Sequence, residues 1–177
     1  MELSISTIVV IVLAMSMLIL GLVLVKNIFS GAQNVVDMNQ DQLENQISKM
    51  YGEDQKLVIY ASSQMVEVTQ GESSGFGFGI KNLNNGSSAN VQFSYSIVIS
   101  GDEVPKNCGV SKETIMDYMV TPKEEAGLSL ASGELTAAKV IFQTDVGAPL
   151  CMVRFRINTF AGEQPYASGF VDVEFVA

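Results

Sequence analysis

The stretch CMVRFRI, residues 151–157, decides the fold of most of this chain. Its odd positions, from Cys151 to Ile157, are all apolar, and the two arginines, Arg154 and Arg156, occupy even positions. An alternation of period two, with one apolar and one charged face, is typical of an antiparallel strand that is buried on one side only. The stretch therefore predicts a half-buried strand of a β-sheet protein.

Stretches of similar character follow one another after Gly52. They lie at residues 57–60, 65–68, 76–80, 91–99, 115–120, 128–130, 140–143 and 170–175. Turn-forming residues separate the strands, as at 84–86 and 132–134. Eight or nine short strands without a convincing helix between them predict an antiparallel, immunoglobulin-like β-sandwich over residues 53–177.

The two cysteines and one glycosylation pattern lie in this β-rich region. The chain has an even number of cysteines, Cys108 and Cys151, which suits a disulfide in an oxidising compartment. The alternative is that both cysteines are free and buried. A disulfide would be worth about 4 kcal/mol in the chain-entropy model. Asn85-Gly86-Ser87 is an acceptor pattern for an N-glycan, or a chance match. Both features favour an extracellular domain.

The chain begins with an uncharged apolar run from Leu3 to Val25. As a helix this run would be roughly 35 Å long, which is enough to cross a bilayer. It could equally be surrounded by other helices in an assembly. Positive charge follows the run, at Lys26, which would place the rest of the chain in the cytoplasm. Because the cysteines and the glycosylation pattern favour the outside, we expect that a basic leader preceding Met1 has been removed.

An apolar stripe continues beyond Lys26. Its members recur at intervals close to three, four or seven, at positions 28, 32, 35, 36, 43, 47 and 50. We therefore predict one helix from about Ser4 to Tyr51, closed by Gly52, so that a helical segment over 1–52 (3–25 fully apolar, 26–51 amphipathic) precedes the sandwich. The predicted class is α+β. The stripe suggests neighbouring copies to pack against, or else docking on the chain's own domain.

Little in the composition points to chemistry. The chain has 177 residues, a formal net charge of −9 and no histidine, so we expect no nucleic-acid partner, no histidine-based catalysis and no imidazole metal site. The glycines at 75, 77 and 79 lie within a strand pattern and are expected to let aromatic neighbours pack. The acidic pairs at 53–54, 102–103 and 124–125 could hold calcium but are better explained as solvated charge. We predict no enzyme, no cofactor and no metal.

An apolar start, MELSISTIVVIVLAMSMLILGLVLV, followed by an amphipathic continuation and a β-sandwich resembles mature archaeal type IV pilins and archaellins. The resemblance implies a subunit that is held in the membrane before assembly. The subunits then form a helical homopolymer, the cell-surface filament, with their helices bundled in its core. Their β-domains coat the outside and often carry N-glycans. Ile5 stands where bacterial-type pilins carry a glutamate, and Glu2 is the only nearby acid, which favours the archaellin-like branch.

The resemblance implies a role in motility or adhesion, and it assigns assembly contacts to the helix. Close helix packing favours small residues, so the candidates combine small and stripe positions. They are Ala14, Ser16, Gly21, Ile28, Gly31, Ala32, Val35, Leu43 and Ile47. The alternative is a single-pass, membrane-anchored sandwich that binds a partner, such as an archaellum stator or surface-layer-binding component.

Overall fold

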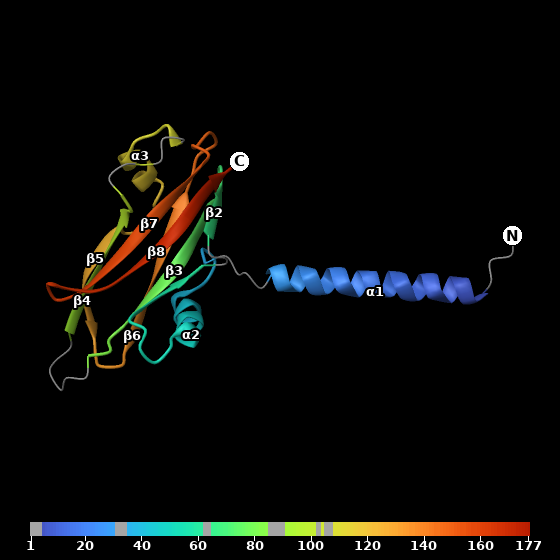
Figure 1. The fold of residues 1–177 in the computed structure, drawn as a ribbon, viewed down its shortest axis with the longest axis horizontal. Helices are drawn as coiled ribbons and strands as arrows, with labels where there is room; N and C mark the ends of the chain where they lie inside the picture. Colours follow the sequence, from blue (N-terminus) through green and yellow to red (C-terminus); the bar gives the residue numbers. More distant parts are fainter. Residues whose placement is uncertain (1–4, 31–34, 62–64, 85–90, 102–103, 105–107) are drawn as a thin grey trace. The chain divides into compact units, whose positions relative to one another are not determined.

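A computed structural model gives the structure of the chain (Figure 1). It describes all residues except 1–4, 31–34, 62–64, 85–90, 102–103 and 105–107. The chain divides into two compact units, Met1–Gln33 and Asn34–Ala177, which are described separately. We call the second unit the head.

The first unit contains helix α1, Ile5–Ser30. The side chains of α1 are described from Val9 to Leu22. Among the described residues, no helix is long and apolar enough to cross a membrane. This finding corrects the predicted membrane span over 3–25.

The predicted single helix from Ser4 to Tyr51 is also wrong, because a second helix starts anew in the head. Helix α2 spans Gln40–Met50 and begins at a capping box. The side chain of Asn39 accepts a hydrogen bond from the Gln42 backbone N–H at 2.8 Å, and the Gln42 side chain accepts one from the Asn39 N–H at 3.1 Å. Asn39 is extended, with φ −77° and ψ 169°, as N-cap residues are, so no helix can run through it.

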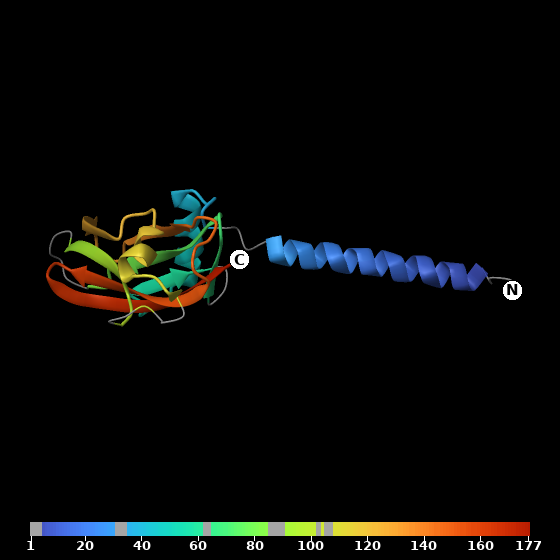
Figure 2. The same cartoon turned by 90° about the horizontal axis from the view of Figure 1, so that it is seen from above.

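The head is a sandwich of two sheets (Figures 1 and 2). Its strands are β1 (Leu57–Tyr60), β2 (Met65–Thr69), β3 (Ser73–Lys81), β4 (Val91–Ile99), β5 (Glu124–Leu130), β6 (Leu135–Gln143), β7 (Cys151–Ala161) and β8 (Gln164–Val176). The order is β1-β3-β6 in one sheet and β2-β8-β7-β4-β5 in the other. A two-sheet sandwich is thus present, and β-structure dominates the described residues, so the predicted α+β class with one long N-terminal helix is wrong. The predicted all-antiparallel pairing needs one correction, since β2 runs parallel to β8.

A short helix replaces part of one predicted strand. Helix α3, Lys112–Asp117, begins at Ser111, whose hydroxyl accepts a hydrogen bond from the Thr114 N–H at 3.3 Å. Ile115 is the buried residue of this single turn and a half, and Met119 forms an isolated bridge with Phe142. Ile115 and Met119 are therefore buried in a helix and a bridge, not in a strand, whereas Val120 is exposed.

The core lies between the two sheets and follows the alternation of CMVRFRI. Cys151, Val153, Phe155 and Ile157 are at most 5% exposed, whereas the intervening side chains face solvent. Aromatic rings meet across the sheets: Phe142 of β6 lies 5.1 Å from Phe155 of β7 between ring centroids. The strand prediction for residues 151–157 is confirmed.

Candidate assembly surface

Helix α1 presents apolar side chains in every direction over its described length. Large side chains at successive positions are all about half exposed or more: Val9, Val10, Ile11, Val12, Leu13, Met15, Met17, Leu18, Ile19, Leu20 and Leu22. Soluble proteins rarely leave a continuous apolar surface of this extent uncovered. The described surface of α1 therefore has the character of a contact surface for other apolar groups.

The predicted small residues of α1 lie within this surface. The Ser16 hydroxyl donates a hydrogen bond to the Val12 carbonyl at 2.8 Å, so this polar group is satisfied inside its own helix. An ideal Cβ placed on Gly21 meets no atom within 4 Å, so the glycine leaves an open notch. Ala14 is exposed on the same helix. These three positions are available for close contact with another helix.

Five other predicted positions lie outside the described residues or side chains. Glu2, Gly31 and Ala32 lie outside the described residues, as does the glycosylation candidate Asn85. Ile28 lies in α1, but its side chain is not among those described.

The rest of the predicted stripe lies in the head, where α2 packs on the outer face of the three-stranded sheet (Figure 1). Val35, Leu43 and Ile47 are at most 1% exposed and form a small second core. Its further members include Met38, Val58 and Ala137. At these three positions the contacts correct the interpretation of the stripe as a seam for neighbouring copies and agree with the alternative, docking on the chain's own domain.

Glycines of β3 make this close approach feasible. An ideal Cβ on Gly77 would lie 2.4 Å from Leu43 Cδ1, and one on Gly79 would lie 2.4 Å from Ile47 Cγ2. At such distances a side chain larger than hydrogen requires the buried Leu43 or Ile47 side chain to shift. The glycines therefore receive α2, and the expectation that they serve to pack aromatic neighbours is wrong for these two.

Polar contacts fix α2 at its first turn. The Gln40 side-chain amide donates to the Ala137 carbonyl of β6 at 2.7 Å and to the Glu44 carboxylate at 3.0 Å. The Lys139 ammonium donates to the carbonyl of Met38. Hydrogen bonds thus hold the start of α2 to β6, the edge strand of the three-stranded sheet. The apolar face of α2 covers this same sheet.

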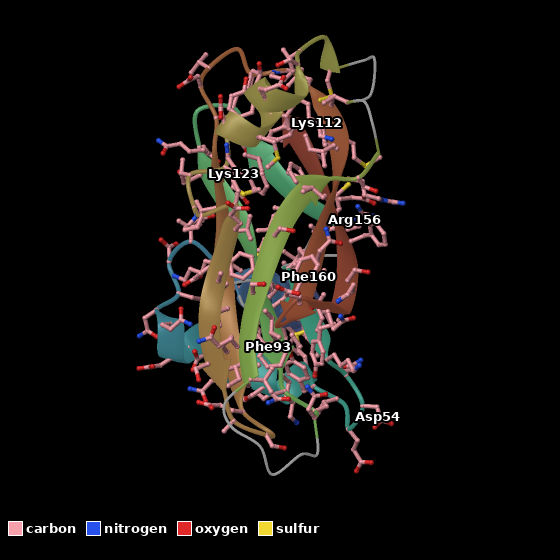
Figure 3. All side chains as sticks on the ribbon, turned by 90° about the vertical axis from the view of Figure 1, so that its left-hand side faces the viewer. Asp54, Phe93, Lys112, Lys123, Arg156 and Phe160 are labelled. Atoms are coloured by element: carbon pink, nitrogen blue, oxygen red, sulfur yellow. A yellow bond between two sulfur atoms is a disulfide. The ribbon has the colours of Figure 1, made fainter. Side chains whose placement is uncertain are left out.

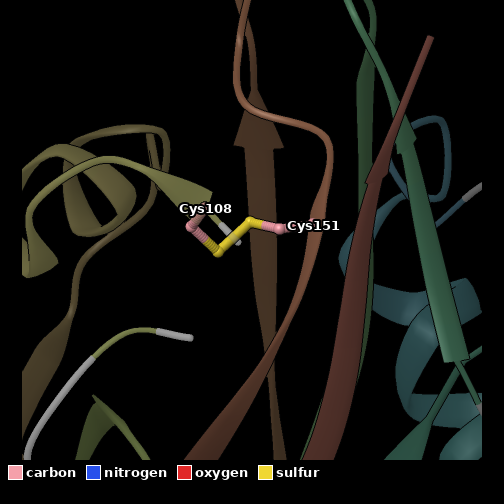
Figure 4. Close-up of a disulfide and its surroundings, with 2 residues drawn as sticks. All are labelled: Cys108 and Cys151. Carbon is pink, nitrogen blue, oxygen red and sulfur yellow. A yellow bond between two sulfur atoms is a disulfide. The ribbon is translucent and has the colours of Figure 1, made fainter. Parts of the chain in front are cut away.

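The predicted disulfide is present. Cys108 and Cys151 are bonded, with a Cα–Cα distance of 5.2 Å and a sequence separation of 43 (Figure 4). The bond joins the start of β7 to the connection that follows β4. Both residues are buried at the end of the core.

The acidic pair Glu124-Glu125 lines a shallow hollow on the outer side of the five-stranded sheet. This hollow has a volume of about 440 Å³, and Ser94, Ser96 and Phe160 complete its wall. Burial raises the pKa of Tyr95, and its hydroxyl donates to the Glu125 carboxylate at 3.1 Å. The described part of the chain contains no group of three or more acidic, histidine or cysteine side chains that could hold a metal ion. Sequence reasoning missed this hollow, although the alternating serines of β4 were a signal for an exposed polar face.

Comparisons with known proteins leave the function open. No family model matches the chain, and no curated protein matches it. Among solved structures, the CARDB domain of the PF1109 protein from Pyrococcus furiosus, in complex with di-metal ions, is 13% identical. That match covers 68% of this chain and 92% of the other, with a TM-score of 0.41.

Two glycosidases match over a part of their length. A β-glucosidase from Listeria innocua is 16% identical over 72% of this chain and 17% of its own, with a TM-score of 0.34. A family 123 glycoside hydrolase from Clostridium perfringens is 11% identical over 68% of this chain and 27% of its own, with a TM-score of 0.36. The chain thus spans less than a third of either enzyme. Similarity at this level assigns no activity, and none of the three proteins is described as a pilin or archaellin.

Proposed function

We propose that this chain is a structural subunit, not an enzyme, that assembles with copies of itself through α1 into an extracellular filament with the head outside. One observation carries the proposal: the described side chains of α1 are apolar and exposed all round, in a unit separate from the head. The free energy of covering such a helix is roughly 1.5–3 kcal/mol for each large side chain removed from water. The small residues within α1 suit a bundle in which helix backbones approach closely.

The disulfide supports an extracellular location. Disulfides persist in oxidising environments and are rare in the cytosol of most organisms. A bonded Cys108–Cys151 pair thus suits a head that is displayed outside the cell.

Electron microscopy of material sheared from the surface of cells that carry the chain tests this proposal. We expect filaments whose main band is identified by mass spectrometry as this chain. Recovery of the chain only as a monomer would contradict the proposal and would direct attention to what the head binds.

A substitution at Gly21 tests the role of α1 without harming the subunit. Because the space around its Cβ is open, Gly21→Leu fits the isolated helix and raises its helix propensity by about 0.8–1 kcal/mol. We expect this variant to lose or shorten the filaments while the head keeps its thermal stability. Leu20→Met, which conserves volume at the neighbouring position, is the matched control and should assemble normally. Normal filaments from Gly21→Leu would count against close packing at this position.

A further inference from the structure

The outer face of the five-stranded sheet carries a cationic and apolar patch. In one row across three strands, Val98 pairs with Arg156 and Arg156 pairs with Phe170. Phe170 is 55% exposed, and Met152 on the same side of β7 is 49% exposed. Arg156 is exposed and has no hydrogen-bond or ion-pair partner among the described residues. We call these four residues the Arg156 patch; arginine, methionine and phenylalanine are residue types that interfaces favour.

The same face carries an acidic hollow beside the patch. Glu124, Glu125, Ser94, Ser96 and Phe160 are its main lining residues, and we call it the Glu124 hollow. Glu125 already accepts a hydrogen bond from Tyr95, whereas Glu124 has no partner among the described residues. In Figure 3, Arg156 projects away from the sheet and Phe160 lies nearer to β5.

Strand register fixes the distance between the two features. Glu124 pairs with Ser96, and Ser96 pairs with Asn158, so Glu124 lies two strands from β7 in the row next to that of Arg156. At about 4.8 Å per strand and 3.4 Å per residue, the two positions are roughly 12 Å apart along the face. Two complementary features on one face satisfy each other twice when two copies meet face to face around a two-fold axis.

We propose that the outer face of the five-stranded sheet is a self-complementary contact surface for a second copy of this chain, with Arg156 of each copy in the Glu124 hollow of the other. The planar guanidinium can bond the free Glu124 carboxylate and lie against the ring of Phe160. Phe170, which pairs with Arg156, then covers apolar surface beside the ion pair. A partner for the Arg156 cation must offer carboxylates. A second copy of this chain, whose formal net charge is −9, offers the Glu124 carboxylate in matching geometry.

The contact is suited to heads that are already held together. The Arg156 patch has four residues, whereas a standard stable interface has about 20–30 residues and roughly 800 Å² on each partner. Joining subunits through α1 would raise the local concentration of heads, to the millimolar range for short linkers, where a weak contact is occupied. In this respect the inference rests on the proposed assembly through α1.

Arg154 provides a matched control two residues away on the same face. Its guanidinium is engaged within its own chain by two hydrogen bonds to Asp172, at 2.7 and 2.8 Å. An exposed arginine on the same strand that is already paired should contribute no comparable contact between copies.

Zero-length cross-linking tests the inference on the full chain. We would mix ordinary and ¹⁵N-labelled copies of an Arg156→Lys variant, couple amines to carboxylates with a carbodiimide, and digest the product for mass spectrometry. The expected product is a mixed-isotope peptide pair joining position 156 to Glu124 or Glu125. It should fall at least tenfold when Glu124→Gln and Glu125→Gln are added, and it should be absent from Arg154→Lys.

The outcomes separate the two proposals. The inference would be overturned if the cross-link from position 156 formed only within one isotopic copy. It would also be overturned if Arg154→Lys gave as much mixed-isotope product as Arg156→Lys. Both results hold whether or not filaments form. Electron microscopy of the same samples reports on α1 assembly independently. Filaments without the mixed-isotope product would support assembly through α1 and contradict the proposed contact between heads.

Discussion

Replacing Gly77 by alanine should destabilise the head through α2. The new Cβ would lie 2.4 Å from Leu43 Cδ1 and 3.2 Å from Leu43 Cδ2, and Leu43 is fully buried. Overpacking of this kind costs about 1–3 kcal/mol. Alanine recovers roughly 0.5–1 kcal/mol relative to glycine in a strand. We therefore expect a net loss of about 1–2 kcal/mol in the free energy of unfolding.

A double-mutant cycle identifies Leu43 as the cause. Leu43→Ala alone should cost about 2–4 kcal/mol, because it leaves a cavity in the small core under α2. It also makes room for the new methyl group, so the combined variant should lose about 1–2 kcal/mol less than the sum of the two. Urea unfolding of residues 34–177, the compact head unit, measures these values. Circular dichroism is the suitable signal, because the chain has no tryptophan.

The matched control is Gly52→Ala. Its nearest neighbour would be Gln55 Cδ at 3.7 Å, at an exposed position, so the change in unfolding free energy should stay within about 0.5 kcal/mol. An unchanged stability in Gly77→Ala, or strict additivity with Leu43→Ala, would refute the glycine–helix account.

Three further predictions concern the head. Replacing Cys108 and Cys151 together by serine should lower the free energy of unfolding by about 2–4 kcal/mol, measured in urea, and a loss below about 1 kcal/mol would contradict a bond that constrains the unfolded chain. Asn39→Ala removes the cap of α2 and should cost about 1 kcal/mol in the same assay, with Asn39→Asp as a conservative variant that retains stability. The hydrogen bond from Arg154 lowers the pKa of Asp172, so the stabilisation from this pair is complete above the usual aspartate pKa near 4 and disappears as pH falls through the lowered folded value. Because the Arg154 side chain is 59% exposed, Asp172→Asn should cost at most about 1 kcal/mol at pH 7, and an equal cost at pH 2 would contradict the assignment.

The strands of the head could be predicted because alternation is a local property. The residues 151–157 show their buried and exposed faces in one short window, and the structure keeps that pattern without exception. The parallel pairing of β2 with β8 joins Met65–Thr69 to residues 172–176, and no local pattern reports a register over that separation.

The break before α2 has a local signal in the sequence. Asn39 and Gln42 have the spacing of a capping box, which marks the start of a helix, and the continuous apolar period concealed it. Periodicity reports which residues share a face, but it does not report whether the backbone is unbroken between them. A capping pair inside a periodic run therefore favours two helices over one.

The α2 stripe and the β3 glycines are both visible in the sequence, but neither pattern identifies the other as its partner. A stripe predicts that a face is covered, and glycines at alternate strand positions predict that something approaches the backbone, but neither pattern names what arrives. Once they are placed together, Leu43 over Gly77 and Ile47 over Gly79 account for both patterns. The stripe is then satisfied within the head, so α1 is the large apolar surface in the described chain that still lacks a cover. We propose that copies of the same helix supply that cover, because their chemistry and length match.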